Sequence, residues 1–302
     1  MLLDTNLLWA KKAKTDNCYF SIVIPSWNNL PYLKLCIESI RKNSTYLHQI
    51  IVHINEGTDG TLDWIKLQPD IDYVHSNTNI GVCYALNACR KIVSTEYFLY
   101  LNDDMYVCPD WDKFLREEIE SIGHNYFFLS ATAIEPIASS ACAIEYDFGR
   151  DITTFDESKL LRQYHELKMN DWQGSTWPPN VVHVSVWDLV GGYSIEFSPG
   201  MYSDPDFSMK LWKMGVRLFK GISKSRVYHF GSKSVKRIKT NPGYNMFIAK
   251  WGFTCSTLTK WHLHRGSVYN GLLPEPTIPL HIKAKNIFKK ILLLFKKVSL
   301  DN

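Results

Sequence analysis

The stretch YFLYLNDDMYV, residues 97–107, begins as an apolar aromatic run and ends in one amide and two carboxylates, Asn102, Asp103 and Asp104. An apolar run bounded by turn residues is typical of a buried strand in a parallel sheet. Asn and Asp often end such a strand simply as turn formers. Clustered oxygen ligands at the end of a rigid strand also suit a hard divalent cation that is shared with substrate phosphates. The neighbouring sequence decides between a turn and a cation site.

Strand and helix patterns alternate around this stretch. Further apolar runs predict strands at residues 19–24, 49–54 and 72–76. Helical spacing follows each run, in LPYLKLCIESIRK, GTLDWIKL and VCYALNACRKIV. This alternation predicts an α/β fold with a mostly parallel central sheet flanked by helices. Ligands bind such sheets beyond the carboxyl ends of the strands. Polar segments stand at these ends, at residues 25–28, 55–57, 76–77 and 102–104.

The net charge of +4 is unevenly distributed along the 302 residues. Residues 1–206 carry 15 Lys and Arg against 28 Asp and Glu, whereas residues 207–302 carry 19 against 2. This asymmetry suggests metal binding in the first part and anionic partners in the second, with solvated charged faces as the simpler alternative. The seven cysteines form no C-x-x-C pair, and the amino terminus is a poor secretory signal. With no apolar run near twenty residues, we expect a cytoplasmic protein without a transmembrane span, and no nucleic-acid partner.

A second informative stretch is SPGMYSDPDFSMKLWKMGVRLFKGISKSRVYHFGS, residues 198–232. It predicts a helix capped by Ser203 or Asp204 and followed by two strands, VRLFKG and SRVYHF, the second of which presents His229. Asp204 and Asp206 then lie near a helix amino terminus, which favours their charged forms.

The last segment, LHIKAKNIFKKILLLFKKVSL, follows the Pro-rich break LLPEPTIP. On a helix its apolar residues form one stripe: Ala284, Ile287, Phe288, Ile291, Leu292, Leu294, Phe295 and Val298. Six lysines avoid most of that stripe: 283, 285, 289, 290, 296 and 297. This pattern predicts that residues 281–299 bind an anionic membrane surface, with the protein peripheral at the inner face of the membrane. The alternative is a terminal helix packed on its own domain or on a homodimer partner.

Seven motifs occur in one order: SIVIPSWNN, NEGTDGT, NIGVCYALN, YLNDDM, DLVGGYS, YSDPDFSMKLWKMG and VYHFGS. In this order they resemble the family-2 glycosyltransferases, inverting enzymes of the GT-A (Rossmann-like) fold, over about residues 19–232. The resemblance implies a glycosyltransferase domain at 1–275, divided into a nucleotide-binding part (about 19–130) and an acceptor and catalytic part (131–275). Residues 276–302 then form a basic amphipathic helix.

The resemblance also implies a reaction. A nucleotide-diphosphate-sugar donor, most simply a UDP-sugar, would pass its sugar to a glycan or lipid-linked glycan acceptor in one displacement with inversion. Surface polysaccharide or glycolipid synthesis is the expected setting. Two alternatives are a sugar nucleotidyltransferase and a non-catalytic, membrane-associated carbohydrate-binding protein of the same fold. The first usually has a Gly-rich basic phosphate loop, which PSWNN lacks, and the retained acidic residues disfavour the second.

Metal and catalytic residues follow from the same motifs. Asp104 matches the last Asp of the family's Asp-any-Asp motif and is the expected ligand of Mn²⁺ or Mg²⁺, with His229 completing the coordination. Asn102 stands where an Asp is usual, so it supplies a hydrogen bond but no charge. Asp204 is the expected general base, because an inverting transfer needs one carboxylate to take the acceptor's proton. Asp206 is the second candidate, and helix capping is the alternative for both acids.

Donor and acceptor binding involve more of the chain. The expected nucleotide and donor set is Pro25, Ser26, Trp27, Glu56, Asp59, Asn79, Gly81, Asn102, Asp103, Gly191 and Gly192. Acceptor recognition is expected from residues 140–190, where tryptophan faces suit sugar rings. Trp172, Trp177 and Trp187 are candidates for sugar stacking, with core packing as the alternative for each. Ser232 and Lys233 are candidates for phosphate binding.

Overall fold

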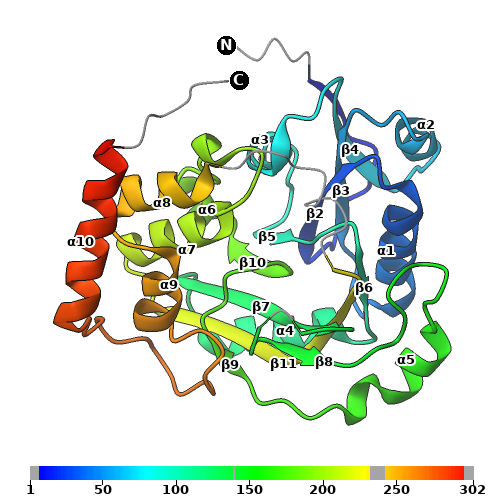
Figure 1. The fold of residues 1–302 in the computed structure, drawn as a ribbon. Coiled ribbons are helices and arrows are strands. Elements are labelled where there is room, and N and C mark those ends of the chain that lie inside the picture. The colour runs from blue at the N-terminus through cyan, green and yellow to red at the C-terminus, as the bar shows by residue number, and fades with distance from the viewer. Residues whose placement is uncertain (1–6, 139, 232–241, 296–302) are drawn as a thin grey trace.

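The computed structural model describes residues 7–138, 140–231 and 242–295 (Figure 1). Ser232, Lys233 and the end of the predicted membrane-binding segment, residues 296–299, lie outside these ranges. The strands are β1 (Leu8–Ala10), β2 (Phe20–Trp27), β3 (Gln49–Asn55), β4 (Ile71–Ser76), β5 (Tyr97–Tyr100), β6 (Met105–Val107), β7 (Phe127–Glu135), β8 (Ala143–Glu145), β9 (Trp172–Gln173), β10 (Asn180–His183) and β11 (Leu218–His229). The α-helices are α1 (Leu30–Asn43), α2 (Thr61–Lys66), α3 (Gly81–Arg90), α4 (Trp111–Ile122), α5 (Glu157–Gln163), α6 (Val184–Leu189), α7 (Ser203–Met214), α8 (Gly243–Trp251), α9 (Cys255–Thr257) and α10 (Leu280–Phe295). Short 3₁₀ turns cover Tyr164–Glu166 and Ile195–Phe197, and a π-helical turn covers Leu258–His262.

The first part of the chain folds as the sequence predicts. Strands β4, β3, β2 and β5 lie side by side and parallel, so their carboxyl ends meet at one edge. Strand β2 runs further than expected, through Pro25 to Trp27. Proline is tolerated there because pairing with β5 ends at Val23, so the strand needs no N–H on that side at Pro25.

The second part adds strands in an order that the sequence did not predict. Strand β10 lies between β5 and β7 and is antiparallel to both. The two strands expected at VRLFKG and SRVYHF are one strand, β11, whose register against β7 shifts between Ile222 and Arg226. Strand β6 pairs with the end of β11 and places Met105 opposite His229.

Helices cover both faces of this sheet and make a three-layer α/β/α domain (Figure 1). One face packs against α1, α2 and α4 through fully buried side chains such as Leu33, Ile65 and Trp111. The other face packs against α3, α6, α7 and α8 through side chains such as Leu86 and Phe207. The sheet therefore holds its loops at the strand ends on a rigid support, as the predicted fold class requires.

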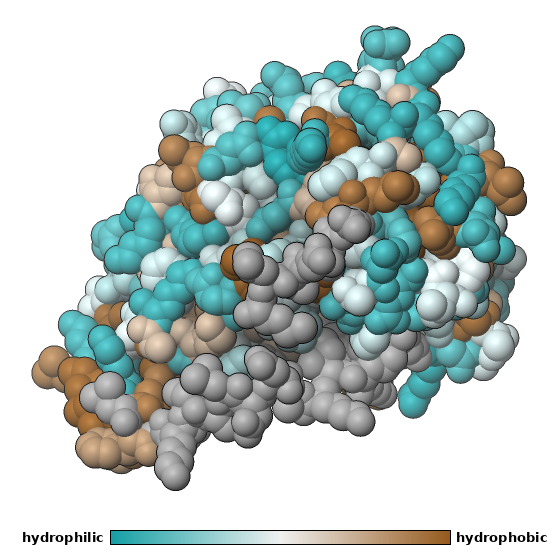
Figure 2. Space-filling view, turned by 90° about the horizontal axis from the view of Figure 1, so that it is seen from above, coloured by the Kyte–Doolittle hydropathy of each residue, from teal (hydrophilic) through white to brown (hydrophobic). Residues whose placement is uncertain are grey.

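Helix α10 packs on the domain with an unexpected face. Asn286 is buried, and its side-chain oxygen accepts hydrogen bonds from Thr254 N at 3.3 Å and Thr257 Oγ1 at 3.2 Å. Much of the predicted apolar stripe points outward: Ile287, Phe288, Ile291, Leu292 and Phe295 are exposed. Figure 2 shows apolar side chains gathered at the edge of the molecule where α10 lies in Figure 1. Within the described residues no helix is long and apolar enough to cross a bilayer.

Candidate active site

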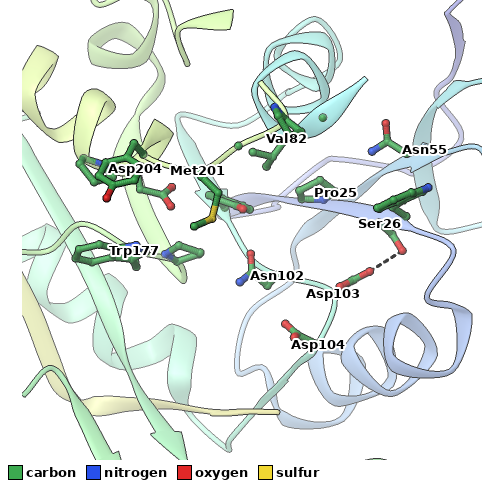
Figure 3. A pocket seen from close by; sticks show the side chains of 18 of the residues that line it. Pro25, Ser26, Asn55, Val82, Asn102, Asp103, Asp104, Trp177, Met201 and Asp204 are labelled. Carbon is green, nitrogen blue, oxygen red and sulfur yellow. Dashed lines mark hydrogen bonds between the residues drawn. The ribbon is translucent and has the colours of Figure 1, made fainter. Parts of the chain in front are cut away.

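A cavity of about 630 Å³ opens at the carboxyl ends of β2, β3 and β5 (Figure 3). The amino-terminal ends of α3 and α7 close it on one side, and α9 with the following turn forms a further wall. Nine of the residues that the sequence predicted line this cavity: Pro25, Ser26, Trp27, Asn79, Gly81, Asn102, Asp103, Asp104 and Asp204. Residues as far apart in the chain as Pro25 and Asp204 therefore meet at one place.

The acidic pair after β5 is buried and held by its neighbours. Asp103 and Asp104 are 6% and 4% exposed. The Ser26 hydroxyl donates a 2.7 Å hydrogen bond to Asp103 Oδ2, drawn as the dashed line in Figure 3. The backbone oxygen of Asp104 accepts from the Phe230 N–H at 3.2 Å. These bonds fix the motif between β2 and the end of β11.

His229 lies beside Asp104, although it does not line the cavity. Its Nε2 is 3.4 Å from Asp104 Oδ1, and its Nδ1 is 2.8 Å from Glu135 Oε1. Burial by itself would lower the His229 pKa, but the two carboxylates outweigh burial and raise the pKa to about 10. The two carboxylates thus favour a positive charge here, which a bound cation would supply when the imidazole gives up its proton.

The donor atoms here fit a divalent cation. A carboxylate and an imidazole are neighbours, and Glu135 orients the imidazole as carboxylates orient metal-ligating histidines. No group of three His, Cys, Asp or Glu side chains able to hold a metal occurs in the described part of the chain. An ion at Asp104 and His229 would therefore take its other ligands from phosphate oxygens and water, as Mg²⁺ commonly does.

Asp204 stands on another wall, at the start of α7. The Tyr193 hydroxyl donates to Asp204 Oδ1 at 2.8 Å. Tyr193 is itself fixed by Asn87, whose side chain donates to Tyr193 O at 2.7 Å and accepts from Tyr193 N at 2.8 Å. Burial raises the pKa of Asp204 to about 7, while the Tyr193 hydrogen bond acts in the opposite direction. A carboxylate with this pKa is suited to proton transfer near neutral pH.

Neither acid caps α7, so the capping prediction is wrong. The residue before the helix is Tyr202, which adopts the left-handed conformation with φ of 70° and makes no side-chain cap. The Ser203 hydroxyl donates back to the Gly200 carbonyl. The left-handed turn at Tyr202 leaves the Asp204 carboxylate free of a capping role.

Asp206 is placed outside the cavity. It is fully buried, accepts from Trp251 Nε1 at 2.9 Å and pairs with Lys250 Nζ at 2.9 Å. The two-residue spacing on a helix turns Asp206 about 200° away from Asp204. It joins α7 to α8, and we do not retain it as a candidate base.

The second loop contributes Asn55 where the sequence suggested Glu56 and Asp59. Asn55 Oδ1 accepts from Ile80 N at 3.0 Å. Glu56 accepts from Asn28 Nδ2 at 3.0 Å, and Asp59 accepts from Leu30 N at 2.8 Å. Neither acid lines the cavity, because both connect the loops that precede α1 and α2.

Glycines near the cavity serve chain packing. A Cβ at Gly81 would lie 2.3 Å from Ser198 Oγ, so this residue lets the segment before α7 approach α3. A Cβ at Gly192 would lie 2.4 Å from Asn87 Oδ1. Gly191 and Gly192 do not line the cavity, contrary to the expected donor-sugar contact.

Several lining residues were not assigned a role from the sequence. They are Asn55, Val82, Tyr100, Pro178, Pro199, Gly200, Met201, Tyr202, Pro205, Cys255, Ser256, Thr259 and Arg265. Trp177, a predicted sugar-stacking candidate, also lines the cavity. Trp177 lay within the predicted acceptor region. Six of the others belong to irregular segments, where no hydrophobic period marks a position as facing a ligand: Pro178, Pro199, Gly200, Met201, Tyr202 and Arg265.

The fold is that of GT-A glycosyltransferases. Residues 21–137 match the family model described as Glycosyl transferase family 2, which confirms the predicted resemblance over the part of the chain that carries the nucleotide-binding strands and Asp104. The family match and the fold together support a glycosyltransferase enzyme.

Solved structures of glycosyltransferases share this fold. The S. aureus TarS fragment 1-349 aligns with a TM-score of 0.54 and 12% identity over 94% of this chain and 73% of its own. The same fragment in complex with UDP-GlcNAc aligns with a TM-score of 0.55 and 13% identity, over 92% of this chain and 72% of its own. GalNAc-T7 with UDP, GalNAc and Mn²⁺ aligns with a TM-score of 0.53 and 16% identity, over 72% of this chain but only 44% of its own. A comparison with curated proteins found no match.

Proposed function

We propose that the protein transfers a sugar from a nucleotide-diphosphate sugar to a hydroxyl of a glycan, in a single displacement that inverts the anomeric centre. One observation carries this proposal: Asp204 and Asp104 face the same cavity from different walls (Figure 3). One carboxylate is suited to take a proton, and the other is suited to neutralise a leaving diphosphate. An inverting transfer needs these two functions on opposite sides of the sugar.

Each residue then has a task. Asp204 takes the proton of the acceptor hydroxyl as the hydroxyl oxygen bonds to the anomeric carbon, while the bond to the diphosphate oxygen breaks. The Tyr193 hydroxyl holds the carboxylate in place. A divalent cation held by Asp104 and His229 would neutralise charge on the departing nucleoside diphosphate. Asn102 and Asp103 line the cavity, and their proposed role is to bind ribose or donor sugar hydroxyls.

The proposed donor is a UDP-sugar. Solved structures of similar fold are described with UDP and UDP-GlcNAc, and GalNAc-T7 also with Mn²⁺. In this chain Pro25, Ser26 and Trp27 stand at the end of β2, with Asn55 and Asn79 beside them in the same cavity. These residues offer an apolar and amide-lined wall for a base and ribose. Glu56 and Asp59 support that wall from outside.

Helix α10 supports a membrane-bound setting. Its packed face is polar at Asn286, and its outward face is apolar with Lys283, Lys285 and Lys290 exposed around it. This combination fits an anionic lipid surface by both hydrophobic burial and charge. Asn286 binds Thr254 and Thr257, which flank the cavity residues Cys255 and Ser256. A lipid-linked acceptor held at the inner face of a membrane would therefore be close to the cavity.

A screen of nucleotide-sugar donors tests the proposed transferase function. Nucleotide sugars are supplied with and without Mn²⁺ or Mg²⁺, and both donor binding and nucleoside diphosphate release are recorded. We expect metal-enhanced binding of one donor class, lost in Asp104→Asn and retained in Asp63→Asn, a matched exposed aspartate on α2. Absence of metal-enhanced binding and release with every donor, together with an unchanged Asp104→Asn, would refute the proposal.

Liposome flotation tests the membrane proposal. The full chain should float with vesicles containing anionic lipid, and Phe288→Glu should remain at the bottom of the gradient. Leu67→Glu changes a similarly exposed residue far along the chain, at the end of α2, and should float normally. Equal flotation of Phe288→Glu and the wild type would contradict lipid binding by α10. Sedimentation equilibrium on the same variants detects the alternative, a second copy of the chain covering this face.

A further inference from the structure

Among the described residues, Arg265 is a cation that lines the cavity and forms no ion pair. Of the charged side chains in its described lining, three are carboxylates, Asp103, Asp104 and Asp204, and one is a guanidinium, Arg265. The Arg265 guanidinium stacks over the Trp177 ring, with its central carbon 3.8 Å from the ring centroid. Its Nε is buried without a hydrogen-bond partner, and no carboxylate in the described ranges forms an ion pair with it.

Within the described ranges, two thiols are the groups whose titration Arg265 influences. Arg265 acts on the thiols of Cys142 and Cys255, lowering the pKa of each, and it also forms a side-chain hydrogen bond with Cys142. Burial raises the pKa of Cys142, and it raises the pKa of Cys255 to about 11, so both thiols are neutral at physiological pH. A partly buried guanidinium with an unused donor gains most from an anion that accepts two hydrogen bonds.

Arg265 belongs to the acceptor end of the cavity. Figure 3 shows Trp177, on which Arg265 stacks, on the side of Asp204 and away from Pro25 and Ser26. An anion bound there would be near the hydroxyl that Asp204 deprotonates, on the side opposite the nucleotide wall.

A second hollow adjoins the cavity at Arg265. A shallow hollow of about 470 Å³ is lined by Thr259, Lys260, Trp261, His264, Arg265 and Ser267, and it shares Thr259 and Arg265 with the cavity. Lys260 Nζ lies 5.5 Å from the centroid of the Trp261 ring. A cation beside an aromatic face thus occurs twice along one surface, and each pair offers a face for a sugar ring and a charge for an acidic substituent.

We propose that Arg265 recognises an anionic group of the acceptor, so that the enzyme prefers an extended acidic glycan to a neutral one. This inference rests on the proposed transferase function. The group is a carboxylate or a phosphate on a unit near the attacked hydroxyl, and the next units extend over Lys260 and Trp261. A guanidinium binds both kinds of anion through the same paired hydrogen bonds.

Acceptor kinetics test this inference with the donor found in the screen. Three probes are compared: an oligosaccharide that contains glucuronate, the same oligosaccharide with its carboxyl groups reduced to alcohols, and a glycerol phosphate oligomer. Wild-type kcat/KM for the better anionic probe should exceed that for the reduced probe at least about tenfold. Arg265→Gln should raise the acceptor KM for that probe by about 10- to 100-fold and remove the preference. The acceptor KM of Arg265→Lys should lie between the values for the wild type and Arg265→Gln, because lysine keeps the charge but loses the planar pair of donors.

Controls separate the outcomes. Arg162→Gln, an exposed arginine on α5, should behave as the wild type. Equal use of the glucuronate, phosphate and reduced probes overturns the inference, and so does a rise in donor KM rather than acceptor KM in Arg265→Gln. If no probe is turned over, saturation-transfer NMR measures binding of the two anionic probes, and equal signals for wild type and Arg265→Gln overturn it. Metal-dependent donor binding, measured without acceptor, reports separately on the transferase function.

Discussion

Replacing Tyr193 by phenylalanine should move the pH dependence of transfer to higher pH. The Tyr193 hydroxyl donates to Asp204 at 2.8 Å and stabilises the ionised carboxylate. Burial raises the pKa of Asp204 to about 7 despite this hydrogen bond. Without the hydroxyl, burial acts unopposed, so the Asp204 pKa should rise further and the base should be protonated at neutral pH.

The size of the shift follows from the strength of the lost interaction. A hydrogen bond to a charged group is worth about 1.5–3 kcal/mol, and one pKa unit corresponds to about 1.4 kcal/mol. The pKa of Asp204 should therefore rise by about one to two units. The ionised fraction at pH 7 falls from about one half to about 1–10%, so kcat/KM should fall about 5- to 50-fold and recover near pH 9.

The assay is nucleoside diphosphate release at saturating metal, measured from about pH 5.5 to 9.5. Tyr228→Phe is the matched control, because the Tyr228 hydroxyl donates to Gly149 O at 2.7 Å and has no contact with Asp204. It should leave the acid limb of the profile in place. If the limb of Tyr193→Phe coincides with that of the wild type, or if activity falls by one factor at every pH, Asp204 is not the base.

Three other substitutions probe separate parts of the site. Asp204→Asn should lower kcat about 10²- to 10⁴-fold. The folded-state pKa of Asp204, about 7, lies above the unfolded value of 3.8, so the carboxyl group destabilises the fold from about pH 4 upward and most strongly above pH 7. Asp204→Asn should therefore also raise Tm most at pH 8, less at pH 5 and hardly below pH 4, and calorimetry showing no pH dependence would contradict this. Glu135→Gln weakens the support of His229 and should raise the Mn²⁺ concentration for half-maximal donor binding about 10- to 100-fold, whereas an unchanged titration argues against His229 as a ligand. Gly81→Ala places a Cβ 2.3 Å from Ser198 Oγ at a φ of 76° and should lower the free energy of unfolding in urea by about 2–5 kcal/mol, so an unchanged midpoint would refute the close packing.

The nucleotide-binding part could be predicted because its signals are local. Each strand is a short apolar run, and each run ends in polar residues at the same sheet edge. This geometry alone brings Ser26, Asn102 and Asp104 together, and the structure confirms their proximity. The rule does not fix which residue of a loop faces inward, so Asn55 was missed beside Glu56.

The cavity wall around Asp204, Trp177 and Arg265 depends on contacts between segments that are distant in the chain. Strand β10 enters between β5 and β7 from about eighty residues further along the chain and brings Trp177 and Pro178 to the cavity. The choice between Asp204 and Asp206 depends on the left-handed residue Tyr202, for which the sequence gives no signal. Arg265 follows a short π-helical turn that has no hydrophobic period. None of these positions can be derived from propensity or spacing.

The packing of α10 decides how its role can be tested. Asn286 accepts hydrogen bonds from Thr254 and Thr257, and these residues flank Cys255 and Ser256 in the cavity wall. A chain cut at Pro279 would lose the exposed apolar face and would also leave this buried polar cluster without its central partner, which is costly inside a protein. Loss of activity in such a truncation would therefore not distinguish loss of membrane binding from collapse of the cavity wall that contains Cys255 and Ser256. Phe288→Glu changes only the outward face, so it isolates lipid binding from the integrity of the site.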